Sequence, residues 1–186
     1  MTDISELNIY IVERKKYTFN VINGAFKGYN KVSVYNADVK EFFKEHKEID
    51  CFVSPANAFG RMSGGFDAAL SDILGWDFQK KVQNYIIDKY YGEQVVCSSF
   101  FIETDISGVS LIHTPTMQYP SIIKDSMIVY YCMRSALICA MENDVKNIVI
   151  PVFGGATGGI LPHIAAKRMK EAYLQIINRS GAKRNI

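Results

Sequence analysis

Residues 53–67 read Val53-Ser-Pro-Ala-Asn-Ala-Phe-Gly-Arg-Met-Ser-Gly-Gly-Phe-Asp67, directly after the apolar residues Cys51 and Phe52. A short apolar run bounded by turn residues is typical of a buried strand, and a helix is predicted to begin near Phe66. A loop that leaves a strand and enters a helix presents backbone N–H groups to an anion. The simpler alternative is an ordinary loop in which Asn57 closes an Asx turn. Four residues of this loop could together accept a diphosphate and its adjacent ribose: Asn57, Gly64, Gly65 and Asp67.

A second glycine-rich window follows another apolar run: Ile148-Val-Ile-Pro-Val-Phe-Gly-Gly-Ala-Thr-Gly-Gly-Ile-Leu-Pro162. The chain has 13 glycines, and seven of them fall in the two windows. Glycines that only punctuate turns should be scattered, so this clustering points to a function for the bare backbone. The second window lacks the Gly-Lys-Ser/Thr of a nucleotide-binding Walker loop. It predicts a nest of main-chain N–H groups that holds phosphate without a cationic side chain.

Hydrophobic periodicity predicts strands that alternate with helices. Strands are predicted at 8–12, 31–35, 51–53, 94–102, 109–113 and 147–151, and helices at 19–26, 38–46, 76–91, 127–141 and 164–177, with Gly92 as the C-cap of the third helix. The connection between the strands at 94–102 and 109–113 is short enough to make them an antiparallel hairpin. The alternation elsewhere predicts an α/β sheet with parallel strands, covered by helices on both faces.

Ligands of such sheets bind beyond the carboxyl ends of the strands. Three segments are predicted to lie there: the two glycine-rich windows and Asn36-Ala-Asp-Val39. Asp38 is suited to cap the helix that follows it. A carboxylate in that position can also accept a hydrogen bond from an exocyclic amine or a ribose hydroxyl.

Composition limits the class of protein. The chain has 186 residues, 48% of them hydrophobic, which suits one domain with a substantial core. Its net charge of +2 favours neither a nucleic-acid nor a membrane partner. The four cysteines show no metal-ligand or disulfide pattern, so we predict reduced thiols and no metal site. Residues 1–6 do not resemble a signal peptide, and we expect a cytoplasmic protein, with the nucleus as the alternative.

At four places, in the same order, the chain resembles the macro domain family, whose members bind ADP-ribose. Val53-Ser-Pro-Ala-Asn57 and Gly64-Gly-Phe-Asp67 are similar to the family's V-N-A-A-N and G-G-G-V/I-D/A. Leu111-Ile-His-Thr114 is similar to its V-I-H-T strand, and Ile150-Pro-Val-Phe-Gly-Gly-Ala-Thr-Gly158 to its I-P-A-L/I-G/S-T-G loop. Asn36-Ala-Asp-Val39 stands where the family has G-D-I.

The resemblance implies a three-layer α/β/α macro-domain-like fold with a mixed, mostly parallel central sheet. It implies a single domain over 1–186, in which 8–26 is an N-terminal strand–helix addition and about 179–186 a basic tail. The implied ADP-ribose contacts are Asp38 with the adenine amine, Val39 with the ring, Asn57 with the distal ribose, and Ala56, Gly64, Gly65, Phe66, Gly155, Ala156, Thr157, Gly158, Gly159 and Ile160 along the diphosphate and ribose. Asp67 and Asn57 are the implied catalytic residues, because Asp67 matches the aspartate that activates water in hydrolytic members.

The sequence also departs from the family pattern. Ser54-Pro55 replaces the usual Asn-Ala, and Gly159-Ile160 replaces an aromatic residue that clamps the distal ribose. Many members continue past the last helix with a strand and a helix, and we expect residues 8–26 to fill that part of the sheet. The aromatic residue that stacks on adenine has no assigned counterpart.

Three functions are compatible with these residues. We expect a hydrolase that acts on an ADP-ribose derivative: a mono-ADP-ribosyl ester, O-acetyl-ADP-ribose or ADP-ribose 1″-phosphate. A reader module that binds ADP-ribose without chemistry is the alternative, and it needs the same loops without Asp67. A Rossmann-type methyltransferase, based on Glu13 and Asp38, is a more distant one. No cofactor is expected, and the expected partner is ADP-ribose or an ADP-ribosylated substrate.

Overall fold

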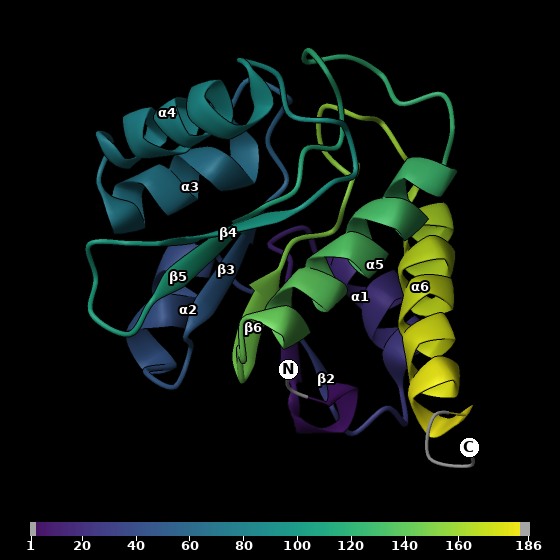
Figure 1. Ribbon diagram of the computed structural model, residues 1–186. Helices are drawn as coiled ribbons and strands as arrows, with labels where there is room; N and C mark the ends of the chain where they lie inside the picture. The colour runs from purple at the N-terminus through teal and green to yellow at the C-terminus, as the bar shows by residue number, and fades with distance from the viewer. Residues whose placement is uncertain (1–2, 183–186) are drawn as a thin grey trace.

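The computed structural model describes residues 3–182 and shows one mixed six-stranded sheet (Figure 1). The strands are β1 (Asn8–Val12), β2 (Val32–Tyr35), β3 (Cys51–Ser54), β4 (Phe100–Glu103), β5 (Ser110–His113) and β6 (Asn147–Ile150). Their order is β2-β1-β6-β3-β5-β4, and every neighbouring pair is parallel except the antiparallel β4–β5 hairpin. The predicted mixed, mostly parallel sheet is confirmed. The end of the predicted basic tail, 183–186, lies outside the described residues.

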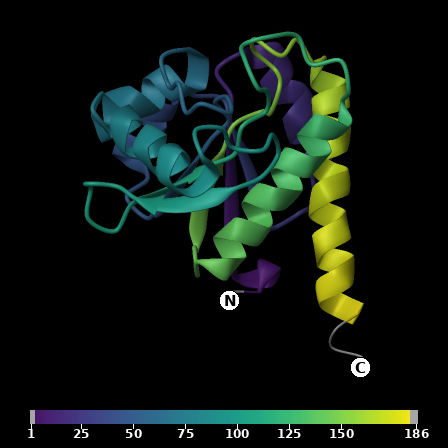
Figure 2. The ribbon, with the colours of Figure 1, turned by 45° about the horizontal axis from the view of Figure 1, so that its top comes forward.

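Helices cover both faces of the sheet (Figures 1 and 2). The short 3₁₀ helix η1 (Ile4–Glu6) precedes α1 (Lys16–Phe26), α2 (Val39–Glu45), α3 (Gly65–Leu74), α4 (Phe78–Tyr90), α5 (Met127–Glu142) and α6 (Pro162–Ala182). Buried residues of α1, α5 and α6 form one core with Ile9 and Ile11 of β1, whereas those of α2, α3 and α4 form a second core that includes Val12. Alternate residues of a strand face opposite sides of a sheet. The two cores and the sheet between them make the predicted three-layer α/β/α fold.

The N-terminal strand is an inner strand of the sheet. β1 pairs with β2 on one side and with β6 on the other, so Ile9 lies opposite both Val32 and Ile148. α1 packs against α6 on one face. Because β1 runs parallel to both neighbours, its carboxyl end reaches the same edge of the sheet as the three predicted site segments.

Several predicted boundaries were wrong. α1 begins three residues before the predicted start at 19, and α6 extends five residues past the predicted end at 177, so residues 179–182 are helical and not part of a tail. Residues 94–99 are not part of β4, because their backbone bonds to loops: the Gln94 N–H donates to the Ala58 carbonyl and the Cys97 N–H to the Pro115 carbonyl. α4 ends one residue earlier than predicted, since Tyr91, with a left-handed φ of 54°, is its C-cap in place of Gly92. All four cysteines are free, and no helix within residues 3–182 is long and apolar enough to cross a membrane.

Candidate functional site

Two adjoining cavities open at the carboxyl edge of the sheet. The Asp38 cavity, about 150 Å³, is lined by Val12, Glu13, Arg14, Lys15, Ala37, Asp38, Val39, Gly65, Phe66, Ala69, Pro151, Val152, Gly155 and Ala156. The Asp67 cavity, about 350 Å³, is lined by Pro55, Ala56, Asn57, Arg61, Ser63, Gly64, Gly65, Phe66, Asp67, Thr116, Met117, Pro120, Pro151, Val152, Gly154, Ala156, Thr157 and Gly158. Five residues line both cavities: Gly65, Phe66, Pro151, Val152 and Ala156. The two cavities therefore adjoin along these five residues, and together they are called the cleft.

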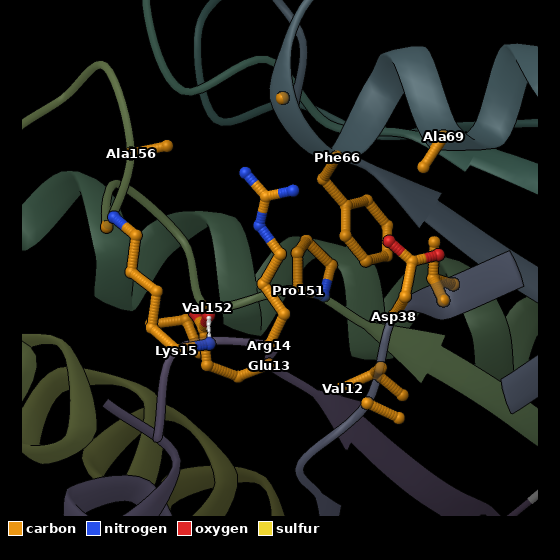
Figure 3. A pocket seen from close by; sticks show the side chains of 14 residues that line it. Val12, Glu13, Arg14, Lys15, Asp38, Phe66, Ala69, Pro151, Val152 and Ala156 are labelled. Carbon is orange, nitrogen blue, oxygen red and sulfur yellow. Dashed lines mark hydrogen bonds between the residues drawn. The ribbon is translucent and has the colours of Figure 1, made fainter. Parts of the chain in front are cut away.

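The Asp38 cavity is built where β1 and β2 end. Asp38 caps α2 as predicted, and its Oδ1 accepts a hydrogen bond of 2.9 Å from the Lys40 N–H. The Asn36 amide donates to the carbonyls of Glu13 and Arg14 at 2.9 and 3.0 Å, which fixes the turn after β1 to the end of β2. Figure 3 shows Arg14 and Lys15 extending from that turn along the cavity, with Phe66 and Asp38 on its other side.

Sequence analysis missed the two cations of this cavity. The glycine-rich window predicted a phosphate site without a cationic side chain, but Arg14 and Lys15 line the cleft beside it. The signal was present, because the strand at 8–12 was predicted to be parallel to the next strand. Its carboxyl end therefore had to lie at the ligand edge of the sheet.

In the Asp67 cavity, Asn57 organises the loop that carries it. Its Oδ1 accepts from the N–H groups of Phe59 at 3.1 Å and Arg61 at 3.4 Å, and its Nδ2 donates to the Arg61 carbonyl at 3.2 Å. The Asx-turn alternative thus holds for this side chain, although Asn57 also lines the cavity beside Ala56. An amide with these bonds stiffens the cavity wall.

The second glycine-rich window forms the opposite wall. A Cβ added to Gly158 would lie 2.6 Å from the Ile123 Cδ1 and 2.9 Å from the Gly154 carbonyl oxygen, so only glycine fits there. Gly155, Ala156, Thr157 and Gly158 line the cleft. Gly159 and Ile160 line neither cavity, and their N–H groups instead donate to carbonyls of the same loop, at Ala156 and Gly154.

Asp67 lies in the first turn of α3 and is only 7% exposed, yet it lines the cavity. The Ser54 hydroxyl donates a 2.6 Å hydrogen bond to its Oδ1. Burial raises the pKa of Asp67 to about 7, and the Ser54 hydrogen bond opposes this rise. Near neutral pH the carboxyl is therefore divided between acid and base forms. Among residues 3–182 there is no cluster of three or more His, Cys, Asp or Glu side chains that could hold a metal ion.

The geometry can be compared with known proteins at this point. The sequence model of the macro domain matches residues 53–169, more than half of the chain, including both glycine-rich windows. The chain belongs to the macro domain family. Asp38 and the segment from β1 to α2 precede the matched range, so the first cavity combines residues from inside and outside it.

The chain is also similar to one uncharacterised protein in sequence and to solved macrodomains in fold. An uncharacterised protein of Aquifex aeolicus (strain VF5) is 30% identical over 125 residues, which cover 67% of this chain and 72% of that protein. A mutant of the Oceanobacillus iheyensis macrodomain, solved with ADPR, superposes with a TM-score of 0.63 at 17% identity over 93% of this macro domain and 80% of that chain. The macrodomain of Mycobacterium tuberculosis DarG superposes with a TM-score of 0.59 at 15% identity over 69% and 84%.

Because the chain belongs to the macro domain family, the distant alternative of a Rossmann-type methyltransferase is discarded. That alternative needed Glu13 as a ligand-binding acid. In this macro domain the Glu13 Oε1 accepts a 2.7 Å hydrogen bond from the Lys15 N–H, so the side chain holds its own turn.

Replacing Asp67 by Asn should stabilise the protein in a pH-dependent way. The folded-state pKa of about 7 lies above the ordinary pKa of an aspartate side chain, 3.8. The stability contributed by this carboxyl is therefore complete below about pH 4 and is lost as the pH rises through 7. The neutral amide avoids this loss, so Asp67→Asn should raise Tm by about 5 °C or more at pH 8.5 and change it little at pH 4. Thermal unfolding at both pH values checks this, and an equal effect at both would contradict it.

Proposed function

We propose that this macro domain binds ADP-ribose, with adenine in the Asp38 cavity and the distal ribose in the Asp67 cavity. The diphosphate would lie at the junction, the place where the five residues shared by the two cavities meet the ligand. The observation that carries the proposal is the shared lining of the two cavities, which places them side by side with Asp38 in one and Asp67 in the other. A nucleotide with a second sugar has this elongated form. The Oceanobacillus iheyensis structure with ADPR supports the choice of ligand, since it has the same fold.

The junction suits a diphosphate for two reasons. α3 begins at Gly65, and the free N–H groups of its first turn attract an anion. Facing it, the loop from Gly155 to Gly158 offers main-chain N–H groups with little side-chain cover. Arg14 and Lys15 add positive charge at the adenine side of this junction. The two walls and the two cations together would hold the phosphates.

Arg14 and Phe66 supply the stacking surfaces of the adenine site. They come from different elements and line the same cavity as Asp38 (Figure 3). A guanidinium plane and an aromatic ring both stack on nucleobases. Asp38 uses Oδ1 for the cap of α2, and the second oxygen of a carboxylate can accept from the adenine amine. Arg14 thus takes the place of the aromatic residue that sequence comparison could not assign.

We further propose that Asp67 makes this macro domain a hydrolase of an ADP-ribose derivative. In its ionised form the carboxylate takes a proton from water. The water oxygen then forms a bond to the anomeric carbon of the distal ribose, and the bond to the leaving carboxylate or phosphate breaks with its electron pair. The pKa of about 7 supports this role, because a general base is most effective when its pKa is near the working pH.

ADP-ribose should bind more tightly than AMP, and S-adenosylmethionine should give no heat in calorimetric titration. Ala156 is exposed at the junction, so Ala156→Glu should leave Tm unchanged and weaken ADP-ribose binding at least about tenfold, because it places a negative charge beside the diphosphate. Ser107→Glu, on the β4–β5 turn at the opposite edge of the sheet, adds the same charge and should have no effect. Absence of heat with ADP-ribose where S-adenosylmethionine binds would overturn the proposal.

Arg14→Ala should weaken adenosine by a factor of about ten, since stacking on a base contributes roughly 1–3 kcal/mol, and should weaken AMP and ADP-ribose by at least that factor because their phosphates also lose a nearby cation. Lys27→Ala, which removes an exposed charge at the end of α1, is the control for net charge. Titration followed by NMR measures all three ligands. A loss confined to the two phosphorylated ligands would place Arg14 at the phosphates and exclude stacking.

Asp67→Ala should lower turnover of a mono-ADP-ribosyl ester by about 10²- to 10⁴-fold, the usual contribution of a general base, and leave ADP-ribose affinity largely intact. Released ADP-ribose measures the rate, and calorimetry measures the affinity. Wild-type protein that binds ADP-ribose and releases none from the ester, O-acetyl-ADP-ribose or the 1″-phosphate would be a reader module. Unchanged turnover in the variant would remove Asp67 from the mechanism.

A further inference from the structure

Ser54 is the last residue of β3 and is fully buried. Its backbone is held by β5, because the Thr114 N–H donates to the Ser54 carbonyl at 2.9 Å and His113 lies opposite Ser54 in the parallel register. Its hydroxyl donates to the Oδ1 of Asp67 at 2.6 Å. The bond thus joins the rigid centre of the sheet to the first turn of α3, and at 2.6 Å it is short enough for a charge-assisted hydrogen bond.

Few interactions other than the Ser54 hydrogen bond influence the protonation of Asp67. Burial raises the pKa of Asp67, and hydrogen bonds from Ser54 and from its own backbone N–H lower it; no charged side chain of the described residues contributes. Arg61 is the other charged residue of the same cavity. From β5, His113 faces the same side of the sheet as Ser54, and burial lowers its pKa to about 3, so it carries no charge near neutral pH.

We propose that Ser54 is the positioning residue of Asp67: its hydroxyl holds the carboxyl in one orientation in both protonation states and favours the ionised form that abstracts a proton from water. The inference rests on the proposed hydrolase function. It concerns a position at which the family pattern has asparagine and this chain has serine. An asparagine amide nitrogen can only donate, so an asparagine side chain would have to rotate its amide to accept from the protonated acid. A hydroxyl donates to the carboxylate and accepts from the protonated acid, and the carboxyl stays in place as it titrates.

The direct test follows the Asp67 carboxyl carbon by NMR in ¹³C-aspartate-labelled protein against pH, with the signal assigned through Asp67→Asn. Ser54→Ala should move the titration midpoint upward by about one to two pH units, the effect expected for a lost hydrogen bond to a charged group. Ser71→Ala is the matched control. Ser71 is also buried, one turn further along α3, and its hydroxyl donates to the Met62 carbonyl at 3.0 Å. It should not move the midpoint.

Turnover gives the second readout. The rate should rise with pH through about 7 in wild type, and the rise should move upward by the same amount in Ser54→Ala. Ser54→Thr keeps the hydroxyl and should restore both the midpoint and the profile. Ser54→Cys, nearly isosteric and a weaker donor, should give a smaller upward shift, and it decides the case if the alanine variant does not fold.

The outcomes separate this inference from the function on which it rests. An unchanged midpoint in Ser54→Ala and Ser54→Cys, or an equal shift in Ser71→Ala, overturns the role of Ser54 whatever the chain binds. Calorimetry with ADP-ribose is run on the same wild-type sample. No binding there overturns the proposed function, and a shifted midpoint in that case reduces Ser54 to a partner of Asp67 without a catalytic consequence.

Discussion

Parallel pairing of β1 with both β2 and β6 is the constraint on which the cleft depends. Parallel strands end at the same edge of a sheet, so this pairing brings the turn at Arg14 beside Asp38 and beside the glycine-rich loop after β6. The Asn36 amide then fixes that turn through two main-chain carbonyls. If β1 lay at the edge of the sheet, outside β2, the turn at Arg14 would be separated from the loop after β6 and the first cavity would lose a wall.

Local patterns predicted the elements and their class because each signal is contained in a few residues. The strand at 8–12, the cap at Asp38 and the Gly65 entry into α3 depend on neighbours in sequence, and the structure confirms them. Residues 94–99 were predicted to form a strand because their side chains favour β structure. Side-chain preference does not identify the hydrogen-bond partners of the backbone. Their N–H groups bond to loops at Ala58 and Pro115, which no local pattern encodes.

The parts of the site that are formed by main chain were predictable from the sequence. The parts in which side chains from distant elements come together were not. Glycine clustering indicated both walls of the cleft, and at Gly158 the structure shows a steric reason for the missing side chain. Arg14 was missed because its role depends on the order of strands. The bond from Ser54 to Asp67 was missed for a related reason, since a serine that departs from a motif gives no sign of the carboxyl it contacts thirteen positions later.

One side-chain contact joins two strands that lie far apart in the sequence. The Asn8 amide of β1 donates to Asn147 of β6, 139 positions along the sequence. Closing so long a loop is slow, and its entropy must be recovered from contacts that form at the same time. The first cavity draws residues from both ends of this span, so it cannot exist in an N-terminal fragment. Formation of this cavity therefore requires the chain to extend through the loop after β6, and no fragment that ends before that loop can complete the cavity wall.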